Sequence, residues 1–247
     1  MSVSPAIIWL ASYPRSGNEF ARLCLACRLH LRTIDLYADW NASETQRVWS
    51  ELLGDHPIAA DVSSEELASS TKPWLVKTHE LPAEADYPAI YLVRDGRDVL
   101  VSYAHYTLWQ ERGIPSGRDR KAFRAVLKEL ITSTEHFGGW SAHVLTWIQR
   151  EAPPTVVVRY EDLVTSAATK LREALAAVGW DDLETYDDAL PTFEQLHKAF
   201  PQFFRKGKVG GWRDEMSADL HELFWKHHGE AMASLNYLRD GLPGPLA

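Results

Sequence analysis

Arg15 lies in a short polar break between two apolar segments near the start of the chain. The run at 7–11 is apolar and partly β-branched, which predicts a buried strand. From Phe20 onward, apolar residues recur at spacings of three and four, which predicts a helix. Free backbone N–H groups and the positive end of the dipole make a helix start attractive to anions. Since Arg15 adds a permanent charge with forked donors, we expect this loop to bind a phosphate or a sulfate.

Polar residues close the other candidate strands in the same way. Apolar runs at 74–76, 88–93 and 155–159 alternate with helical patterns. This alternation predicts an α/β fold with a central, mostly parallel sheet flanked by helices. Ligands of such sheets bind at the carboxyl ends of the strands. We therefore expect one edge of the sheet to collect Arg15, His79, Arg94, Arg159 and Tyr160.

The remaining segments are expected to be helices and surface loops. Residues 35–72 are typical of short helices and loops, and the charged stretch 111–121 is typical of a surface loop. Helices are expected from about residue 99 and over 121–133, 139–150, 166–178, 192–199 and 217–236.

The composition limits the classes of function. A length of 247 residues with 45% hydrophobic residues suits a single domain over 1–247. A net charge of −8 argues against a nucleic-acid partner. Cys24 and Cys27 fall in a predicted helix without a second ligand pair, so we expect two core residues and no metal. Without a basic leader or a long apolar run, we expect a cytoplasmic protein with no membrane span.

The first loop also lacks the G-x-x-x-x-G-K-[ST] pattern of ATP-binding P-loops. This disfavours an ATP-dependent kinase, although a nucleotide-dependent small-molecule kinase of similar topology stays as an alternative.

Six segments, in the same order, resemble those of the sulfotransferases that use 3′-phosphoadenosine 5′-phosphosulfate (PAPS). They are YPRSGNEF (13–20), KTHELP (77–82), VRDGRDVLVSYAHY (93–106), HFGGWSAHVLTW (136–147), VVRYEDL (157–163) and FRKGKVGGW (204–212). The chain thus looks like a cytosolic-type, bacterial-looking member of that family. The resemblance implies the family's P-loop-nucleotide-kinase-like fold, with PAPS as co-substrate, 3′-phosphoadenosine 5′-phosphate (PAP) as product and a small-molecule acceptor.

The resemblance also assigns roles to residues. His79 is expected to be the general base that takes the acceptor's proton, with Arg15 and Lys77 as cations beside the transferred group. The donor is expected on the first loop and the start of its helix, with the 5′-phosphosulfate at Arg15, Ser16, Gly17, Asn18 and Glu19 and with Phe20 at the nucleotide. The 3′-phosphate is expected on Arg94, Ser102, Arg205, Lys206 and Gly207, and adenine on Tyr160 and Phe193. Arg97 and Asp98 are expected to form a salt bridge or a helix cap, and His105 to be structural or near the acceptor.

The first loop departs from the family pattern. Arg15 replaces a lysine, and a guanidinium does not readily give up a proton, so we expect charge stabilisation without a general-acid role. Asn18 and Glu19 replace two threonines. Asn18 is expected to cap the helix. Glu19 is expected either to point outward or pair with a cation, or else to weaken donor binding. Phe20 replaces a tryptophan and is expected to stack on adenine.

The acceptor is expected to be aromatic or hydrophobic, with a hydroxyl or an amine, although the same rings would suit a carbohydrate. The aromatic candidates for its walls are Tyr37, Trp40, Tyr106, Trp109, Phe137 and Trp140. A non-catalytic relative that binds PAP or PAPS is a further alternative. The oligomeric state, monomer or homodimer, is left open.

Overall fold

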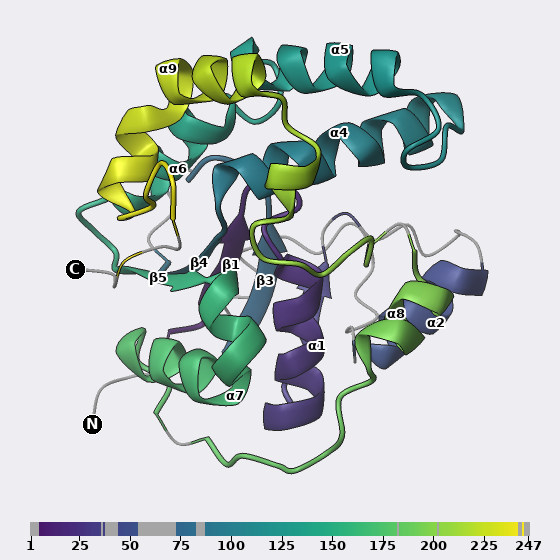
Figure 1. Cartoon of the computed structure of the whole chain (residues 1–247). Coiled ribbons are helices and arrows are strands. Elements are labelled where there is room, and N and C mark those ends of the chain that lie inside the picture. The colour runs from purple at the N-terminus through teal and green to yellow at the C-terminus, as the bar shows by residue number, and fades with distance from the viewer. Residues whose placement is uncertain are drawn as a thin grey trace.

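A parallel sheet forms the centre of the computed structural model, which describes residues 5–35, 37, 44–53, 73–82, 87–181, 183–201, 203–241 and 244. Within these ranges the sheet has five strands in the order β2-β3-β1-β4-β5 (Figure 1). Every pairing is parallel. The strands are β1 (Ile7–Ser12), β2 (Thr33–Asp35), β3 (Trp74–Thr78), β4 (Ala89–Val93) and β5 (Thr155–Arg159).

Helices cover both faces of the sheet (Figure 1). They are α1 (Asn18–Leu29), α2 (Glu44–Leu52), α4 (Gly96–Arg112), α5 (Arg120–Thr132), α6 (Trp140–Ile148), α7 (Tyr160–Ala177), α8 (Phe193–Ala199) and α9 (Ala218–Ser234), with a short 3₁₀ helix, η1 (Gly211–Asp214). Of the helices described, none has both the length and the apolar character that crossing a membrane requires.

The alternation of side chains along the strands explains the two layers. Ile8 and Leu10 of β1 pack with α1 and α7, whereas Ala11 packs with α4, α5, α6 and α9. Strands covered on both faces are apolar in every position, which is why β1 and β4 read as continuous apolar runs. A smaller cluster joins α2 and α8 to the side of α1 through Trp49 and Phe200.

The register places the polar ends of the strands side by side. Leu10 of β1 lies opposite Lys77 of β3, and Asp35 of β2 lies opposite Lys77 on the other side. Ser12, the last residue of β1, therefore lies beside the start of the segment that carries His79. The predicted sheet edge collects Arg15, His79, Arg94 and Tyr160. The expectation for Arg159 was wrong, because its side chain instead donates to the carbonyls of Leu235 and Gly244.

Three details of the predicted elements were wrong. The strand β2 was not expected, and Lys77 lies inside β3 rather than after it. The helix expected from about 166 is the second part of α7, which begins after a kink at Ser166 (φ −148°, ψ 44°), whereas the first part of α7, from Tyr160, was not expected. Since Ser hydrogen-bonds readily outside helical geometry, such a position reads as a helix start in the sequence.

Candidate active site

The loop between β1 and α1 turns sharply through two left-handed residues. Arg15 has a φ of 70° and Gly17 a φ of 98°. A Cβ atom at Gly17 would lie 2.4 Å from the ring of Tyr160, so a side chain does not fit there. Ser16 is buried under the loop. The turn delivers the start of α1, with its unpaired backbone N–H groups, to the carboxyl edge of the sheet.

Asn18 does not cap α1, so that prediction was wrong. The N-cap is Gly17, without a side-chain hydrogen bond, and Asn18 is already the first helical residue. Its side-chain Nδ2 instead donates to the carbonyl of Leu10 and to the hydroxyl of Ser12, both at 3.1 Å. Asn18 therefore ties the helix start to the end of β1.

The side chain of Arg15 reaches across to two other segments. Its Nε donates to the Ser102 hydroxyl in α4 (3.3 Å), and its terminal nitrogen donates to the Phe203 carbonyl (3.2 Å). The guanidinium lies 4.9 Å from the centre of the Tyr106 ring. Burial lowers the pKa of Arg15 to about 10, which leaves the group charged at neutral pH.

One cavity gathers the residues predicted to hold the donor. Of that set, all but the buried Ser16 line it: Arg15, Gly17, Asn18, Glu19, Phe20, Arg94, Ser102, Tyr160, Phe193, Arg205, Lys206 and Gly207. They come from the first loop, α4, the start of α7, α8 and the segment 203–207. We call this space the donor cavity.

Close packing fixes the aromatic part of the donor cavity. Phe20 meets Tyr160 edge to face at 6.1 Å between ring centres, and the Arg94 guanidinium lies 4.4 Å from the Tyr160 ring centre. Gly207 has a φ of 59°, and a Cβ atom there would lie 2.3 Å from the Phe193 ring. Gly17 and Gly207 are thus both needed at this cavity, because each backbone lies close to an aromatic ring.

Asp98 anchors the segment that closes the donor cavity. Its carboxylate accepts hydrogen bonds from the backbone N–H groups of Gly210 (2.7 Å) and Trp212 (2.8 Å). Asp95 caps α4 by accepting from the Arg97 backbone N–H, and forms an ion pair with the Arg97 side chain at 2.8 Å. Arg97 thus forms a salt bridge, as expected, and Asp98 forms one with Arg94 at 3.6 Å.

A second cavity, of about 450 Å³, holds His79 and Lys77. Its aromatic walls are Tyr37, Trp49, Tyr103, Tyr106, Phe137 and Phe203. Trp140 was expected at the acceptor but is instead buried in the core. It is the first residue of α6, and its ring packs against Phe224 and Gly96. Trp109 lines a separate cavity of about 290 Å³ beside Ser102 and Arg205. Trp40 lies outside the described residues.

Hydrogen bonds fix the protonation state of His79. Its Nδ1 lies 2.7 Å from the Ser12 carbonyl, which can only accept, so Nδ1 carries the proton and Nε2 has the free lone pair. Burial and the charge of Lys77 lower the pKa of His79 to about 3. The ring is therefore neutral at physiological pH, with Nε2 as its acceptor.

His143, in the 136–147 segment, supports the backbone of His79 through a hydrogen bond. Its Nε2 donates to the His79 carbonyl (3.0 Å), and its Nδ1 accepts from the Tyr91 hydroxyl (2.8 Å). Burial lowers the pKa of His143 to about 4, so this ring is neutral as well.

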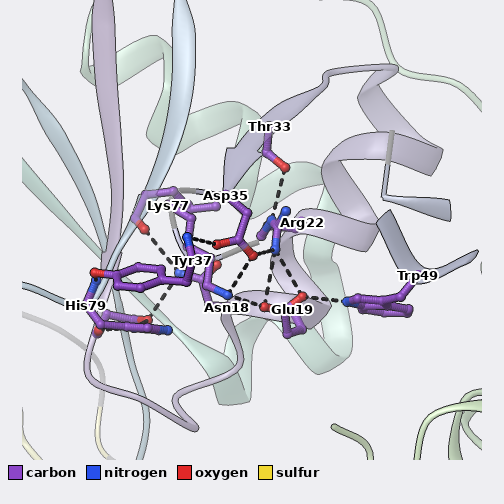
Figure 2. A network of polar contacts seen from close by, with 11 residues as sticks. Asn18, Glu19, Arg22, Thr33, Asp35, Tyr37, Trp49, Lys77 and His79 are labelled. Atoms are coloured by element: carbon purple, nitrogen blue, oxygen red, sulfur yellow. Dashed lines mark hydrogen bonds and ion pairs between the residues drawn. The ribbon is translucent and has the colours of Figure 1, made fainter. Parts of the chain in front are cut away.

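Glu19 pairs with cations, which is the first of its two expected alternatives. Figure 2 shows Glu19, Arg22, Asp35 and Lys77 in one network of two cations and two carboxylates. Lys77 Nζ donates to Glu19 (2.5 Å) and to Asp35 (3.0 Å), and Arg22 lies 3.1 Å from Glu19 and 2.8 Å from Asp35. The Trp49 indole N–H also donates to Glu19 (2.8 Å). We call these four charged residues the ion quartet.

The quartet keeps its four charges at neutral pH. Burial alone would raise the pKa of Glu19, but Lys77 and Arg22 hold it well below its usual range. The pKa of Asp35 is lowered by the same cations against burial, and that of Lys77 is raised by the two carboxylates. An ammonium has three donors, so two ion pairs leave one N–H of Lys77 for another acceptor.

Arg15, Glu19 and Phe203 line both the donor cavity and the His79 cavity. The border between the cavities therefore carries a buried guanidinium, and His79 lies on the side away from the predicted nucleotide residues. A group transferred between the two cavities would pass this border.

Among the described residues, no cluster of three or more His, Cys, Asp or Glu side chains could hold a metal ion.

The family model for the sulfotransferase domain matches residues 5–236. The chain belongs to the sulfotransferase family. Bovine Sulfotransferase 1E1 is 23% identical, with 92% of this chain and 84% of that protein covered. Human Sulfotransferase 4A1 is 22% identical, with 90% of this chain and 78% of that protein covered.

Solved sulfotransferase structures share the fold. Mouse sulfotransferase SULT7A1, solved with PAP, has a TM-score of 0.62 and 20% identity, covering 94% of this chain and 84% of that chain. A retinol dehydratase solved with retinol and PAP has a TM-score of 0.59 and 21% identity, covering 94% and 82%. The family and the fold class expected from the sequence are thus confirmed. The roles of individual residues, the single domain and the oligomeric state stay predictions.

Sequence reasoning missed several residues of this sulfotransferase's candidate site, namely Ser12, Arg22, Asp35, Trp49, His143 as a support for His79, and Glu215. Only Arg22 carried a local signal, since it lies three residues after Glu19 in the same helix, where side chains meet.

Proposed function

We propose that this sulfotransferase moves the sulfuryl group of PAPS to a hydroxyl or an amine of a small aromatic or hydrophobic acceptor. The observation that carries the proposal is the contact between the two cavities. A cavity rich in cations meets, at Arg15, a cavity that presents a neutral histidine.

PAP and PAPS carry anionic groups at the 3′ and 5′ positions of the ribose of an adenosine. The donor cavity offers cations at two places, Arg15 at the start of α1 and the group formed by Arg94, Arg205 and Lys206, with aromatic rings beside them. This distribution suits a 5′-phosphosulfate at Arg15 and a 3′-phosphate at the second group. The two similar structures that were solved with PAP support the same donor.

The reaction forms a bond between sulfur and the acceptor oxygen or nitrogen, and breaks the bond between sulfur and the 5′-phosphate oxygen. His79 Nε2 takes the acceptor's proton, and PAP leaves with the electron pair of the broken bond. Arg15 stabilises the charge on the leaving phosphate without losing its own proton. A base with a pKa near 3 is weak, and the negative charges of bound PAPS would raise it toward a useful value.

The walls of the His79 cavity support the acceptor class. Six aromatic side chains line it, and the charge of Lys77 is already balanced by Glu19 and Asp35. An acceptor that brings an aromatic ring and one hydroxyl needs no further charged partner there.

The test compares His79→Ala with His227→Ala, an exposed residue of α9. Calorimetry with PAP and transfer from radiolabelled PAPS to phenols, alcohols, amines and sugars would be measured for both. We expect His79→Ala to bind PAP as wild type does and to lose about 10²–10⁴-fold in transfer rate, and His227→Ala to keep both. Binding of PAP by wild type without transfer to any acceptor would favour a non-catalytic relative, and binding of ATP in place of PAP would favour a kinase.

A further inference from the structure

Glu215 collects three basic groups beside the donor cavity. Its oxygens accept from one nitrogen of Arg205 at 2.9 and 3.1 Å, from Lys206 Nζ at 2.8 Å and from His105 Nε2 at 2.6 Å. The side chain is only 15% exposed. Burial opposes the charge, but the hydrogen bonds from His105, Lys206 and Arg205 lower the pKa of Glu215 to about 2. It is therefore a carboxylate at neutral pH.

The position of Glu215 does not depend on the two cations. Its backbone N–H donates to the Trp212 carbonyl (3.0 Å), and the Trp212 N–H is itself held by Asp98. From α4, His105 stacks on Phe123 with ring centres 4.3 Å apart. The carboxylate is thus fixed between the end of η1 and α4 before any ligand arrives.

Arg205 and Lys206 face two anions at once if the donor binds as proposed. Both line the donor cavity, and both already donate to Glu215. The Nε of Arg205 is buried and has no hydrogen-bond partner among the described residues. Lys206 is 43% exposed at its side chain and has two further N–H donors. A phosphate that binds to Arg205 and Lys206 therefore lies next to the carboxylate of Glu215, which already pairs with both cations.

We propose that Glu215 is an internal counter-anion of the 3′-phosphate site and sets how strongly the 3′-phosphate is bound. In the empty protein it pairs with Arg205 and Lys206 and offsets one of their two positive charges. In the complex it competes with the 3′-phosphate for their N–H groups and repels that dianion. The inference rests on the proposed function, because it takes the nucleotide to lie with its 3′-phosphate at these cations.

The consequence is a specificity that the cations alone would not give. Glu215 lowers the affinity for nucleotides with a 3′-phosphate and leaves nucleotides without one nearly unaffected. It also favours release of PAP, which retains the 3′-phosphate after transfer.

The experiment measures dissociation constants of PAP and of adenosine 5′-monophosphate by calorimetry for wild type, Glu215→Gln and Glu173→Gln. The control removes one carboxylate from an exposed ion pair with Lys170 on α7. We expect Glu215→Gln to bind PAP about five- to tenfold more tightly and to bind the monophosphate within about twofold of wild type. Glu173→Gln should match wild type for both ligands.

Two results would overturn the inference alone, with the proposed function intact. One is unchanged or weaker binding of PAP to Glu215→Gln, and the other is an equal gain for both nucleotides. If wild type does not bind PAP, the proposed function fails and takes the inference with it. Should Glu215→Gln not fold, Glu215→Asp retracts the carboxylate by one methylene, and a smaller gain selective for PAP is expected, whereas no gain overturns the inference.

Discussion

His79 is held as one tautomer by the backbone of the neighbouring strand. The Ser12 carbonyl requires a proton on Nδ1, and burial beside Lys77 keeps Nε2 unprotonated. We predict that nitrogen NMR of the ligand-free protein shows His79 as the neutral Nδ1–H form, without a titration step between pH 5 and 8. A step near the ordinary pKa of histidine would contradict the assignment.

Glu19 stabilises the fold through the ion quartet. Removing one member of a buried ion pair leaves its partner without compensation, which costs about 3–5 kcal/mol. We predict a loss of this size in the free energy of unfolding for Glu19→Gln at pH 7, measured by urea denaturation. Glu173→Gln, in an exposed pair, should lose less than about 1 kcal/mol.

Wild type and Glu19→Gln also test how this stabilisation depends on pH. Because the pKa of Glu19 is lower in the folded protein than its ordinary value of 4.5, its stabilisation is present above that pH and is lost as the pH falls below it. The difference between wild type and Glu19→Gln should therefore shrink as the pH is lowered from 5 to 3. A difference that stays constant over this range would show that Glu19 is not stabilised as a carboxylate.

At the scale of elements, the turn from β1 into α1 depends on Gly17. Gly17→Ala places a methyl group against Tyr160 in a left-handed residue, whereas Gly113→Ala has a similar positive φ with nothing within 4 Å. We predict a loss of about 1–2 kcal/mol for Gly113→Ala from backbone strain alone, and a further loss of about 1–3 kcal/mol for Gly17→Ala from the clash. Thermal unfolding of both variants checks this, and equal losses would rule out the contact with Tyr160.

The sequence was sufficient for the elements whose pattern is local. The strands β1, β4 and β5 are continuous apolar runs, and the cations of the donor cavity lie in segments with a recognisable order. The strand β2 has only three residues, and its place is set by pairing with β3, which no local pattern reveals. The ion quartet joins α1, β2 and β3, so its partners become neighbours only through the register of the sheet.

At the scale of the whole molecule, Arg97 joins the start of α4 to the C-terminal segment. The fully buried guanidinium pairs with Asp95, donates to the carbonyls of Leu238 and Arg239, and lies 4.1 Å from the Trp212 ring centre. It thereby connects α4, which carries Ser102, with η1 beside the donor cavity.

Arg97→Met should therefore lose about 3–5 kcal/mol of unfolding free energy, since it leaves the buried carboxylate of Asp95 without its cation and two carbonyls without the guanidinium donor. Arg213→Met removes a second, more exposed guanidinium at the same Trp212 ring and should lose less than about 1 kcal/mol. Urea denaturation followed by circular dichroism compares the two. A loss for Arg213→Met as large as that for Arg97→Met would contradict the role given to Arg97.

Arg15 borders the donor cavity, the His79 cavity and a third cavity beside Trp109. A charged ligand in any of them changes the electrostatic field at the same guanidinium. Binding at these places is then thermodynamically linked, and linkage is reciprocal. Whatever factor bound nucleotide imposes on the affinity for the acceptor, the acceptor must impose on the affinity for nucleotide.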